Sequence, residues 1–383
     1  MIIVSLWHIF SEGRAKKVII FHYFCANAKI GCASGIKTSV LVLYTSRFAL
    51  PLRFLMKSAM QSLDAINSFV RTELSRFEEI YNSILKSKCD LLNSSVDAIL
   101  AAQGKKIRPL LNLLAAKVCG EITETTINSA VLLELLHTAT LLHDDVVDDT
   151  LERRGKPSIN ATYGNKVAVL VGDYFLSTAL IMAMQTSSMQ LVSIVSNTGR
   201  DLSEGEIFQL ESTRESVFTE ERYYDIIFRK TASLFSACCQ IGAITGNDAA
   251  VEKGELFKDY GLHIGMAFQI KDDIFDYFED KIGKPTGNDL REGKVTLPLL
   301  YALNKADDVV SQPYKDIITR KEFTSGNIAA LIGFAKSEGG VEYAEAKMQE
   351  HIDKAIELLS VFPDSEAKNA LCALSHFIGD RKY

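Results

Sequence analysis

The stretch from Val131 to Pro157 constrains the fold of this chain more than any other. Between Val131 and Leu142, apolar residues occupy most faces of the predicted helix, which is typical of a helix buried inside a larger helical body. Four aspartates follow at positions 144, 145, 148 and 149, and the basic pair Arg153 and Arg154 comes next. The sequence therefore predicts an acidic cluster at the end of a core helix.

Three of these aspartates, Asp144, Asp145 and Asp148, converge on one side of that helix, because neighbours three or four residues apart share a face. Two unit charges about 4 Å apart repel by roughly 1 kcal/mol in water and by about 4 kcal/mol at an effective dielectric constant near 20, so a partly buried cluster requires cations. Carboxylates with room for water suit Mg²⁺ that substrate phosphates also hold. Guanidinium groups, as in Arg153 and Arg154, match phosphate oxygens. Taken alone, an acidic run of this kind is more commonly a solvated helix end.

A second apolar stretch, Tyr260–Tyr277, repeats the pattern. It ends in three aspartates with the spacing D-D-x-x-D, namely Asp272, Asp273 and Asp276. Two such helices can hold metal ions from opposite walls of one cavity, so the repetition favours a metal and polyphosphate site over two solvated helix ends. Lys284 and Lys294, in the loop that follows, are expected to act as lid-like cations.

Other basic residues are weaker signals. Lys105 and Arg108 lie near the start of the predicted helix Leu110–Val118, where free backbone amides favour an anion, although a solvated loop is the ordinary interpretation. Lys230 lies within the predicted helix Thr219–Thr245 and either reaches into a cavity or extends to solvent.

The remainder of the chain favours an all-α fold. Helical periodicity covers Ser62–Lys88, Gly164–Ala183, Leu191–Leu210, Ile328–Ser337, Val341–Leu359 and Ala367–Ile378, with loop signals at Ser311–Pro313 and Pro363–Asp364. After residue 60 there is no alternating strand pattern of usable length. We expect one domain of about a dozen helices.

Bulk properties exclude several classes. A net charge of −6 without a basic stripe argues against nucleic acid as the main partner. The seven cysteines form no CxxC pair, which favours a reducing compartment and a cytoplasmic location. The uncharged run Val18–Ala28 is shorter than the roughly 18 apolar residues that span a bilayer.

Residues 1–59 form a separate N-terminal extension in this interpretation, and residues 60–383 form the catalytic domain. Residues 1–57 contain eight basic residues and one acidic residue, a net charge of +7, which leaves −13 for the rest. Three explanations remain open: a transit-type leader, a secretory signal, or translation that begins at Met56 or Met60.

Together, these motifs resemble the trans-isoprenyl diphosphate synthases, the polyprenyl synthetase family. The resemblance runs from about Ser62 to the C-terminus and rests on Asp144–Asp148, Asp272–Asp276, the Gly-Lys-Lys-Ile-Arg-Pro motif upstream, and the Arg-Arg-Gly and Gly-Lys-Pro-Thr-Gly motifs behind the two aspartate motifs. One departure is Gln103, which stands where the family usually has glycine. The resemblance implies a single helical bundle around a deep central cavity, usually a homodimer, with peripheral membrane contact for product release.

The resemblance also implies a reaction, the head-to-tail 1'-4 condensation of isopentenyl diphosphate with an allylic diphosphate. Three Mg²⁺ ions would bind Asp144, Asp145, Asp148 and Asp272, supported by Asp273 and Asp276. The allylic diphosphate would be held by Arg153, Lys230, Gln269, Lys284 and Lys294, with Thr231 lining its pocket. Isopentenyl diphosphate would be held by Lys105, Arg108, His137 and Arg154, although a histidine on an apolar helix is commonly a core residue.

Product length is expected to depend on the helix before the first motif. Thr140 and Ala139 are small residues about one turn below Asp144. Short-chain members of the family tend to place an aromatic floor there, and Leu136 lies deeper. The expected product is a polyprenyl diphosphate of six or more isoprene units, such as octaprenyl diphosphate, with geranylgeranyl diphosphate as the alternative.

Three other classes are less compatible with the sequence. A class I terpene cyclase shares the fold but normally has a different second metal motif. A non-catalytic partner subunit would have lost aspartates, and this chain has lost none. A di-iron carboxylate bundle requires two Glu-x-x-His pairs, and Glu134 with His137 forms the only one in the sequence.

Overall fold

The computed structural model describes residues 2–11, 14–23, 40–43, 63–102, 104–246, 251–278 and 286–381. The chain divides into two compact units, Met1–Met60 and Gln61–Tyr383. In the first unit, β1 (Ile2–Ser11), β2 (Arg14–Tyr23) and β3 (Val40–Leu43) form an antiparallel sheet in the order β1-β2-β3.

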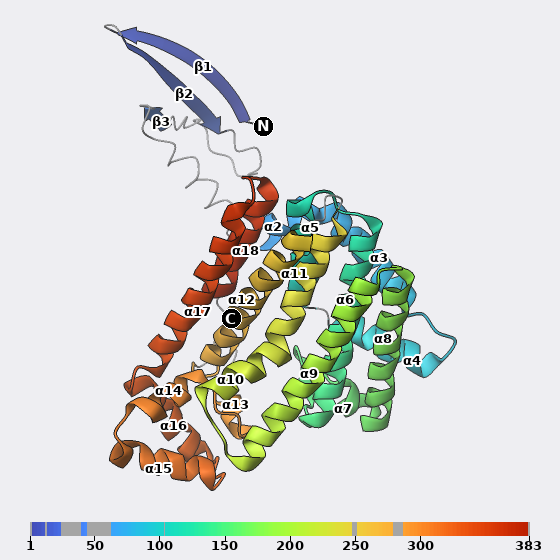
Figure 1. Ribbon diagram of the computed structural model, residues 1–383, viewed down its shortest axis with the longest axis vertical. Helices are drawn as coiled ribbons and strands as arrows, with labels where there is room; N and C mark the ends of the chain where they lie inside the picture. The colour runs from blue at the N-terminus through green and yellow to red at the C-terminus, as the bar shows by residue number, and fades with distance from the viewer. Residues whose placement is uncertain are drawn as a thin grey trace, which may run out of the picture. The chain divides into compact units, whose positions relative to one another are not determined.

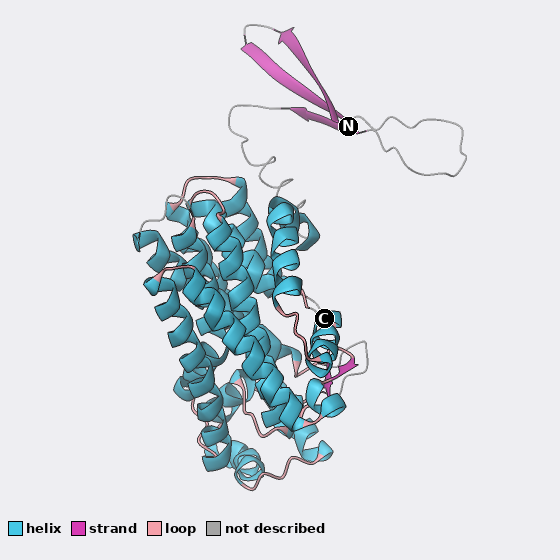
Figure 2. Cartoon of the chain, turned by 90° about the vertical axis from the view of Figure 1, so that its right-hand side faces the viewer, coloured by secondary structure: helices cyan, strands magenta, loops and turns pink. Residues whose placement is uncertain are grey.

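The second unit is helical almost throughout, as Figure 2 shows. Its first half contains α2 (Leu63–Asn67), η1 (Ser68–Val70), α3 (Arg71–Ile84), α4 (Asp90–Ala101), α5 (Ile107–Cys119), α6 (Glu124–Val147), β4 (Glu152–Arg153), β5 (Lys156–Pro157), α7 (Ile159–Tyr163), α8 (Asn165–Gln185) and α9 (Met189–Glu215). The second half contains α10 (Glu220–Ile227), η2 (Phe228–Ala232), α11 (Ser233–Thr245), α12 (Val251–Phe275), α13 (Asn288–Arg291), α14 (Leu297–Lys305), α15 (Asp308–Thr319), α16 (Ser325–Ser337), α17 (Gly340–Leu358), η3 (Leu359–Val361) and α18 (Glu366–Asp380). The predicted all-α class is confirmed.

Helix α11 is the centre of the bundle. It packs against α5, α6, α9 and α12, and Figure 1 shows these long helices running side by side. Close approach is possible because glycines lie at the contacts. A Cβ on Gly242 would lie 2.1 Å from the Asn112 carbonyl oxygen of α5, and one on Gly261 would lie 2.5 Å from the Phe235 carbonyl oxygen. These contacts fix α5 and α12 against α11, and both helices carry predicted site residues.

Two helix boundaries differ from the sequence-based expectation. Helix α6 begins at Glu124, because Thr123 caps it through a reciprocal arrangement with Thr126 rather than with the usual glutamate or glutamine. The expected loop at Ser311–Pro313 is wrong, since Pro313 lies inside α15. A proline in a helix leaves the carbonyl four residues earlier without a donor, and here that residue is Val309, which is 88 % exposed to water.

Helix α8 has an unusual composition for a surface element. By length and composition it could cross a membrane, with a mean hydropathy of 1.9, and 44 % of its most apolar window is buried within the bundle. Its outward face leaves Leu170, Ile181 and Met184 between 58 and 67 % exposed. Half of the helix therefore belongs to the core and half is apolar surface.

Candidate functional site

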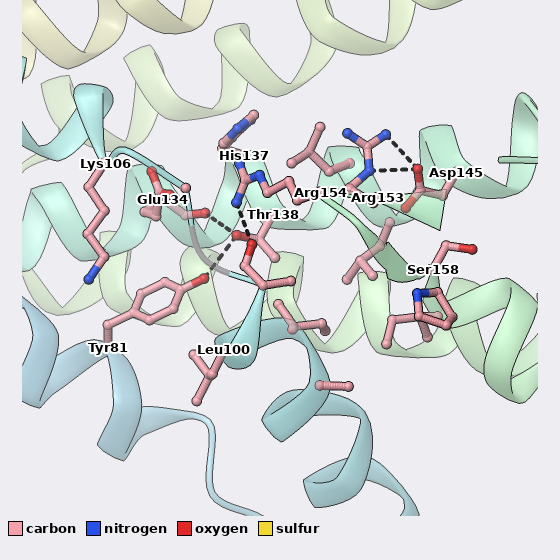
Figure 3. A pocket seen from close by; sticks show the side chains of 18 of the residues that line it. Tyr81, Leu100, Lys106, Glu134, His137, Thr138, Asp145, Arg153, Arg154 and Ser158 are labelled. Carbon is pink, nitrogen blue, oxygen red and sulfur yellow. Dashed lines mark hydrogen bonds and ion pairs between the residues drawn. The ribbon is translucent and has the colours of Figure 1, made fainter. Parts of the chain in front are cut away.

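The first aspartate motif lies where α6 ends. Asp144 and Asp145 belong to the last turn, and Asp148 is the C-cap residue. Asp145 is only 3 % exposed and accepts hydrogen bonds from the Nε and Nη2 atoms of Arg153, at 2.7 and 2.5 Å. Figure 3 shows Arg153 turned toward this carboxylate. Asp145 is thus held by an arginine of its own chain.

A two-residue hairpin turn directs the arginines that follow. Strands β4 and β5 pair Arg153 with Lys156, so Arg154 and Gly155 form the turn, and both have positive φ angles of 54° and 74°. A turn of this type suits the twist of a short hairpin and favours glycine at its second position. The Arg154 guanidinium then donates to the Ala102 carbonyl oxygen at 2.8 Å. The Arg-Arg-Gly motif therefore directs its two arginines to different partners.

In the second motif, on α12, two of the aspartates are likewise held by hydrogen-bond donors of the protein. Asp273 is 4 % exposed and accepts hydrogen bonds from Tyr223 Oη at 2.6 Å and Gln269 Nε2 at 2.8 Å. The Asp276 carboxylate accepts from the backbone amides of Asn288 and Asp289 at 2.8 and 3.1 Å. It therefore holds the short helix α13 against the end of α12.

Three carboxylates remain comparatively free. The Asp144 side chain accepts no hydrogen bond from the residues that the structure describes, and burial raises its pKa to about 6 although Lys230 lowers it. Asp148 has Lys294 Nζ at 3.5 Å, and Asp272 uses one oxygen for Arg381. Within the described part of the chain, no three His, Cys, Asp or Glu side chains are already grouped as a metal site. Substrate oxygens would have to complete one, as is usual for Mg²⁺.

Predicted allylic-site residues line one cavity next to the second motif. Lys230, Thr231, Gln269 and Lys294 contribute to its wall together with Asp273, which was predicted for the metal site, whereas Arg153, also predicted to hold this diphosphate, lines a different cavity. The Thr231 hydroxyl donates to Gln269 Oε1 at 2.7 Å and Gln269 Nε2 donates to Asp273, so these three residues form a continuous chain of hydrogen bonds. Lys284 lies outside the described residues.

Lys230 lies on η2, a π-helical turn that interrupts the expected continuous helix. Such turns often occur at functional sites, because they shift the direction of neighbouring side chains. Helix α9 approaches the turn at Gly205, where a Cβ would lie 2.8 Å from the Lys230 amide nitrogen. The Lys230 ammonium lies 2.5 Å from Glu206 Oε2 of the same helix. Lys230 therefore faces the site and does not extend freely into solvent.

A second cavity lies beside the first motif, and Asp145 contributes to its wall (Figure 3). His137, Arg153 and Arg154 line it together with Tyr81 and Glu134. The Tyr81 hydroxyl meets the Thr138 hydroxyl at 2.9 Å inside this cavity.

Arg108 reaches the same region from α5. Its Nη1 lies 2.9 Å from His137 Nε2, and its guanidinium lies 4.8 Å from the centre of the Phe235 ring. Burial, followed by the charge of Arg108, lowers the pKa of His137 well below its ordinary value. A neutral His137 accepts the Arg108 hydrogen bond and fixes the direction of the guanidinium.

The two lysines before Arg108 have different surroundings. Lys106 forms an ion pair with Glu78 at 2.5 Å. Lys105 is exposed, with its Nζ 5.9 Å from the centre of the Phe377 ring. The structure thus leaves Lys105 available to a ligand. Gly104 permits the loop to lie against the Arg154 guanidinium, since a Cβ there would be 2.6 Å from Arg154 Nη2.

The residues expected to set chain length lie below Asp144 on α6. Ala139 and Leu136 are 1 and 2 % exposed, and Thr140 is half-buried with its hydroxyl donating to the His137 carbonyl oxygen at 2.8 Å. Leu136 faces α9, where a Cβ on Gly199 would lie 3.9 Å from its Cδ1 atom.

Sequence reasoning missed several site residues. Tyr223, Glu134 and Arg381 each contact a predicted site residue or line the cavity beside one, and none belongs to an aspartate motif. Glu206, which pairs with Lys230, is a further residue of this kind. Its spacing to Lys230 gives no signal, because the two residues meet through packing of α9 against η2. For Glu134, its helical spacing of three residues from His137 was an available signal.

Comparisons with known proteins agree on one family. Residues 89–333 match the sequence profile of the polyprenyl synthetase family. The octaprenyl diphosphate synthase of Escherichia coli is 36 % identical over 84 % of this chain and 99 % of its own length. The all-trans-nonaprenyl-diphosphate synthase of Rhodobacter capsulatus is 35 % identical over 82 % of this chain and 96 % of its own length.

Solved structures give the same result. The polyprenyl synthase from Caulobacter crescentus, complexed with calcium and isoprenyl diphosphate, superposes with a TM-score of 0.79 at 32 % identity, covering 84 % of this chain and 98 % of that protein. The geranylgeranyl pyrophosphate synthase from Bacteroides thetaiotaomicron gives a TM-score of 0.73 at 39 % identity, covering 85 and 100 % respectively.

Proposed function

This chain belongs to the polyprenyl synthetase family, and from that premise we propose the metal ligands, the substrate contacts and the product of its reaction. It is a prenyltransferase that joins isopentenyl diphosphate head-to-tail to an allylic diphosphate, as the trans-prenyl diphosphate synthases among its relatives do. The family and the calcium-containing neighbour support the use of a divalent metal.

The proposed metal site rests on a difference between the six aspartates of the two motifs, since some carboxylates are held by protein donors and others are available. We propose that Asp144 and Asp148 from one wall and Asp272 from the other bind three Mg²⁺ ions with the allylic diphosphate. Asp144 accepts no hydrogen bond from the described residues, and Asp148 and Asp272 each contact a basic side chain through one oxygen, so hard carboxylate oxygens stay available for this metal. Asp145, Asp273 and Asp276 support the ligands from behind through Arg153, Gln269 and helix α13.

When bound, the metal ions stabilise negative charge on the departing pyrophosphate. The residues of this chain bind and orient the reactants around that event. Lys230, Arg153 and Lys294 would contact the diphosphate oxygens and add to the same stabilisation. Gln269, fixed between Thr231 and Asp273, holds the wall on which this diphosphate rests.

Isopentenyl diphosphate would lie beside the second cavity, between Lys105, Arg108 and Arg154. Arg108 is oriented by neutral His137, so we assign His137 to positioning the arginine as well as to lining the site. The double bond of isopentenyl diphosphate attacks the allylic carbon, and the proton that it loses passes to the pyrophosphate. The presence of these three cations favours the transferase over a terpene cyclase, which has no need of an isopentenyl diphosphate site.

The product is proposed to have six or more isoprene units. Small Ala139 and half-buried Thr140 leave the level below Asp144 without an aromatic floor. Relatives include both a nonaprenyl and a geranylgeranyl diphosphate synthase, so geranylgeranyl diphosphate stays the alternative.

The experiment uses purified protein with Mg²⁺, radiolabelled isopentenyl diphosphate and farnesyl diphosphate, and the products are dephosphorylated and sized. We expect incorporation of label into a chain of six or more units. Elongation that stops after one addition would identify the geranylgeranyl alternative. A cyclic hydrocarbon formed without isopentenyl diphosphate would contradict the transferase assignment.

We also propose that the exposed apolar face of α8 packs against a second copy of the chain. Leu170, Ile181 and Met184 expose enough apolar side chain on one helix to indicate an interaction surface. A homodimer in the cytoplasm, with peripheral membrane contact when product leaves, is consistent with a helix that is half core and half surface.

A further inference from the structure

The last turn of α18 lies against the metal-binding end of α12. Arg381, which directly follows α18, donates through one nitrogen, Nη2, to Asp272 Oδ1 at 2.7 Å and to the Phe268 carbonyl oxygen at 2.8 Å. Both partners belong to α12. The Arg381 side chain is only 10 % exposed, whereas that of Asp272 is 41 % exposed.

Two aromatic rings also contact the Arg381 guanidinium. The Arg381 guanidinium lies 3.9 Å from the centre of the Phe268 ring and 5.4 Å from that of Phe275. A guanidinium at such distances is attracted by the ring faces. Two hydrogen bonds and two aromatic rings, all from α12, fix the Arg381 side chain in one position, so its contact with Asp272 is not an incidental surface contact.

We propose that Arg381 is a positioning residue for the metal site, which holds Asp272 so that its second oxygen faces the metal ions. The inference rests on the proposed role of Asp272 as a metal ligand. A carboxylate with one oxygen bound to a fixed donor loses most of its rotational freedom, and the other oxygen then has a defined direction. Groups that orient metal ligands in this way strengthen metal binding.

The geometry indicates that Arg381 stays bound to Asp272 when metal binds and does not compete with the metal for this carboxylate. If Arg381 had to leave Asp272 when metal binds, the Phe268 carbonyl oxygen and two aromatic rings would lose their contact with the guanidinium. Asp272 Oδ1 is the only carboxylate oxygen that Arg381 contacts among the described residues, so Oδ2 stays available. Arginine and metal can therefore bind opposite sides of one carboxylate.

The same turn also reaches the proposed isopentenyl diphosphate site. Phe377 lies one turn before Arg381, and its ring centre is 5.9 Å from Lys105 Nζ. Helix α18 packs against both α5 and α12, which carry these two groups. A defect in α18 would therefore disturb both substrates, whereas loss of the Arg381 guanidinium alone should disturb the metal alone.

The test compares the parent with Arg381→Gln and Arg381→Lys. Mn²⁺ binding is titrated by electron paramagnetic resonance in the presence of inorganic pyrophosphate, which needs no turnover. We expect the dissociation constant for Mn²⁺ to rise by about 10- to 100-fold in Arg381→Gln and by less in Arg381→Lys. In assays, the Mg²⁺ concentration for half-maximal rate should rise while KM for isopentenyl diphosphate stays unchanged.

Arg320→Gln is the matched control, because that arginine forms a surface ion pair with Asp316 at 3.9 Å and is 67 % exposed. It should bind Mn²⁺ like the parent. Unchanged or tighter Mn²⁺ binding in Arg381→Gln would overturn the proposal, as would an effect on KM for isopentenyl diphosphate alone. If the glutamine variant does not fold, as judged by circular dichroism, the lysine variant decides between these outcomes. A parent that binds no Mn²⁺ would instead contradict the proposed metal site itself.

Discussion

Six aspartates in the two motifs have identical side chains and different surroundings. Spacing alone grouped them correctly on two helix ends, because periodicity determines which residues share a face. It could not divide them into free and engaged carboxylates, because the partners come from elsewhere in the chain. Tyr223, which donates to Asp273, lies fifty residues before it. Hydrogen-bond partners of this kind depend on tertiary packing and leave no local pattern.

Asp273 gives a prediction for stability. Burial raises its pKa from 3.8 to about 7, although hydrogen bonds from Tyr223 and Gln269 lower it. Between about pH 4 and pH 7 the native protein therefore holds a proton that the unfolded chain has released. The free energy of unfolding of the metal-free protein should fall as the pH rises through this window.

Calorimetry at several pH values tests this sign. The Tm of the metal-free parent should decline from about pH 4 to pH 7 more steeply than that of Asp273→Asn, whose amide does not titrate. Parallel curves for the two proteins would show that Asp273 is not the titrating group.

At the level of elements, long periodic helices were predictable and interruptions were not. Helix α9 was expected at Leu191–Leu210 and extends over Met189–Glu215. The sequence does not predict the π-helical turn η2, because its residues Phe228–Ala232 continue a helical pattern and its packing against α9 leaves no local signal. Pro313 was expected to mark a loop, but it lies inside α15, where an exposed helix tolerates a proline.

Helix α6 carries the prediction on product length. Ala139→Tyr, alone or with Thr140→Phe, places an aromatic ring about one turn below Asp144. The product should shorten towards farnesyl diphosphate while the first condensation remains, because the metal ligands are unchanged. The product distributions of parent and variant are compared side by side, with Leu133→Met as a size-matched control deeper on the same helix. A long product from Ala139→Tyr would show that α6 does not line the growing chain.

For the whole molecule, the α8 face predicts the oligomeric state. Ile181→Asp puts a charge on the exposed apolar face and should convert a dimer to a monomer, because an unpaired carboxylate in an apolar interface is costly. Light scattering after size exclusion measures the mass of parent and variant. Lys166→Asp, at the exposed start of the same helix, is the control for charge alone. A monomeric parent would contradict the prediction.

The division of the chain into two units also belongs to this scale. The structure separates Met1–Met60 from Gln61–Tyr383 as two compact units. The role of the N-terminal unit stays a prediction, because its basic composition is compatible with each of the three explanations. The all-helical fold of the second unit was predictable, since helical periodicity covers most of it and no alternating strand pattern of usable length occurs after residue 60.

Turnover of three single variants tests the central claim, that the two motifs together hold the metal ions and the departing pyrophosphate. Asp144→Asn and Asp272→Asn each remove one charged ligand, and Asp149→Asn changes an exposed neighbour with φ of 49° that asparagine tolerates. We expect kcat to fall by at least about a hundredfold in the first two, with a smaller change in KM, and to stay near the parent value in Asp149→Asn. A kcat within about tenfold of the parent for either Asp144→Asn or Asp272→Asn would contradict the account.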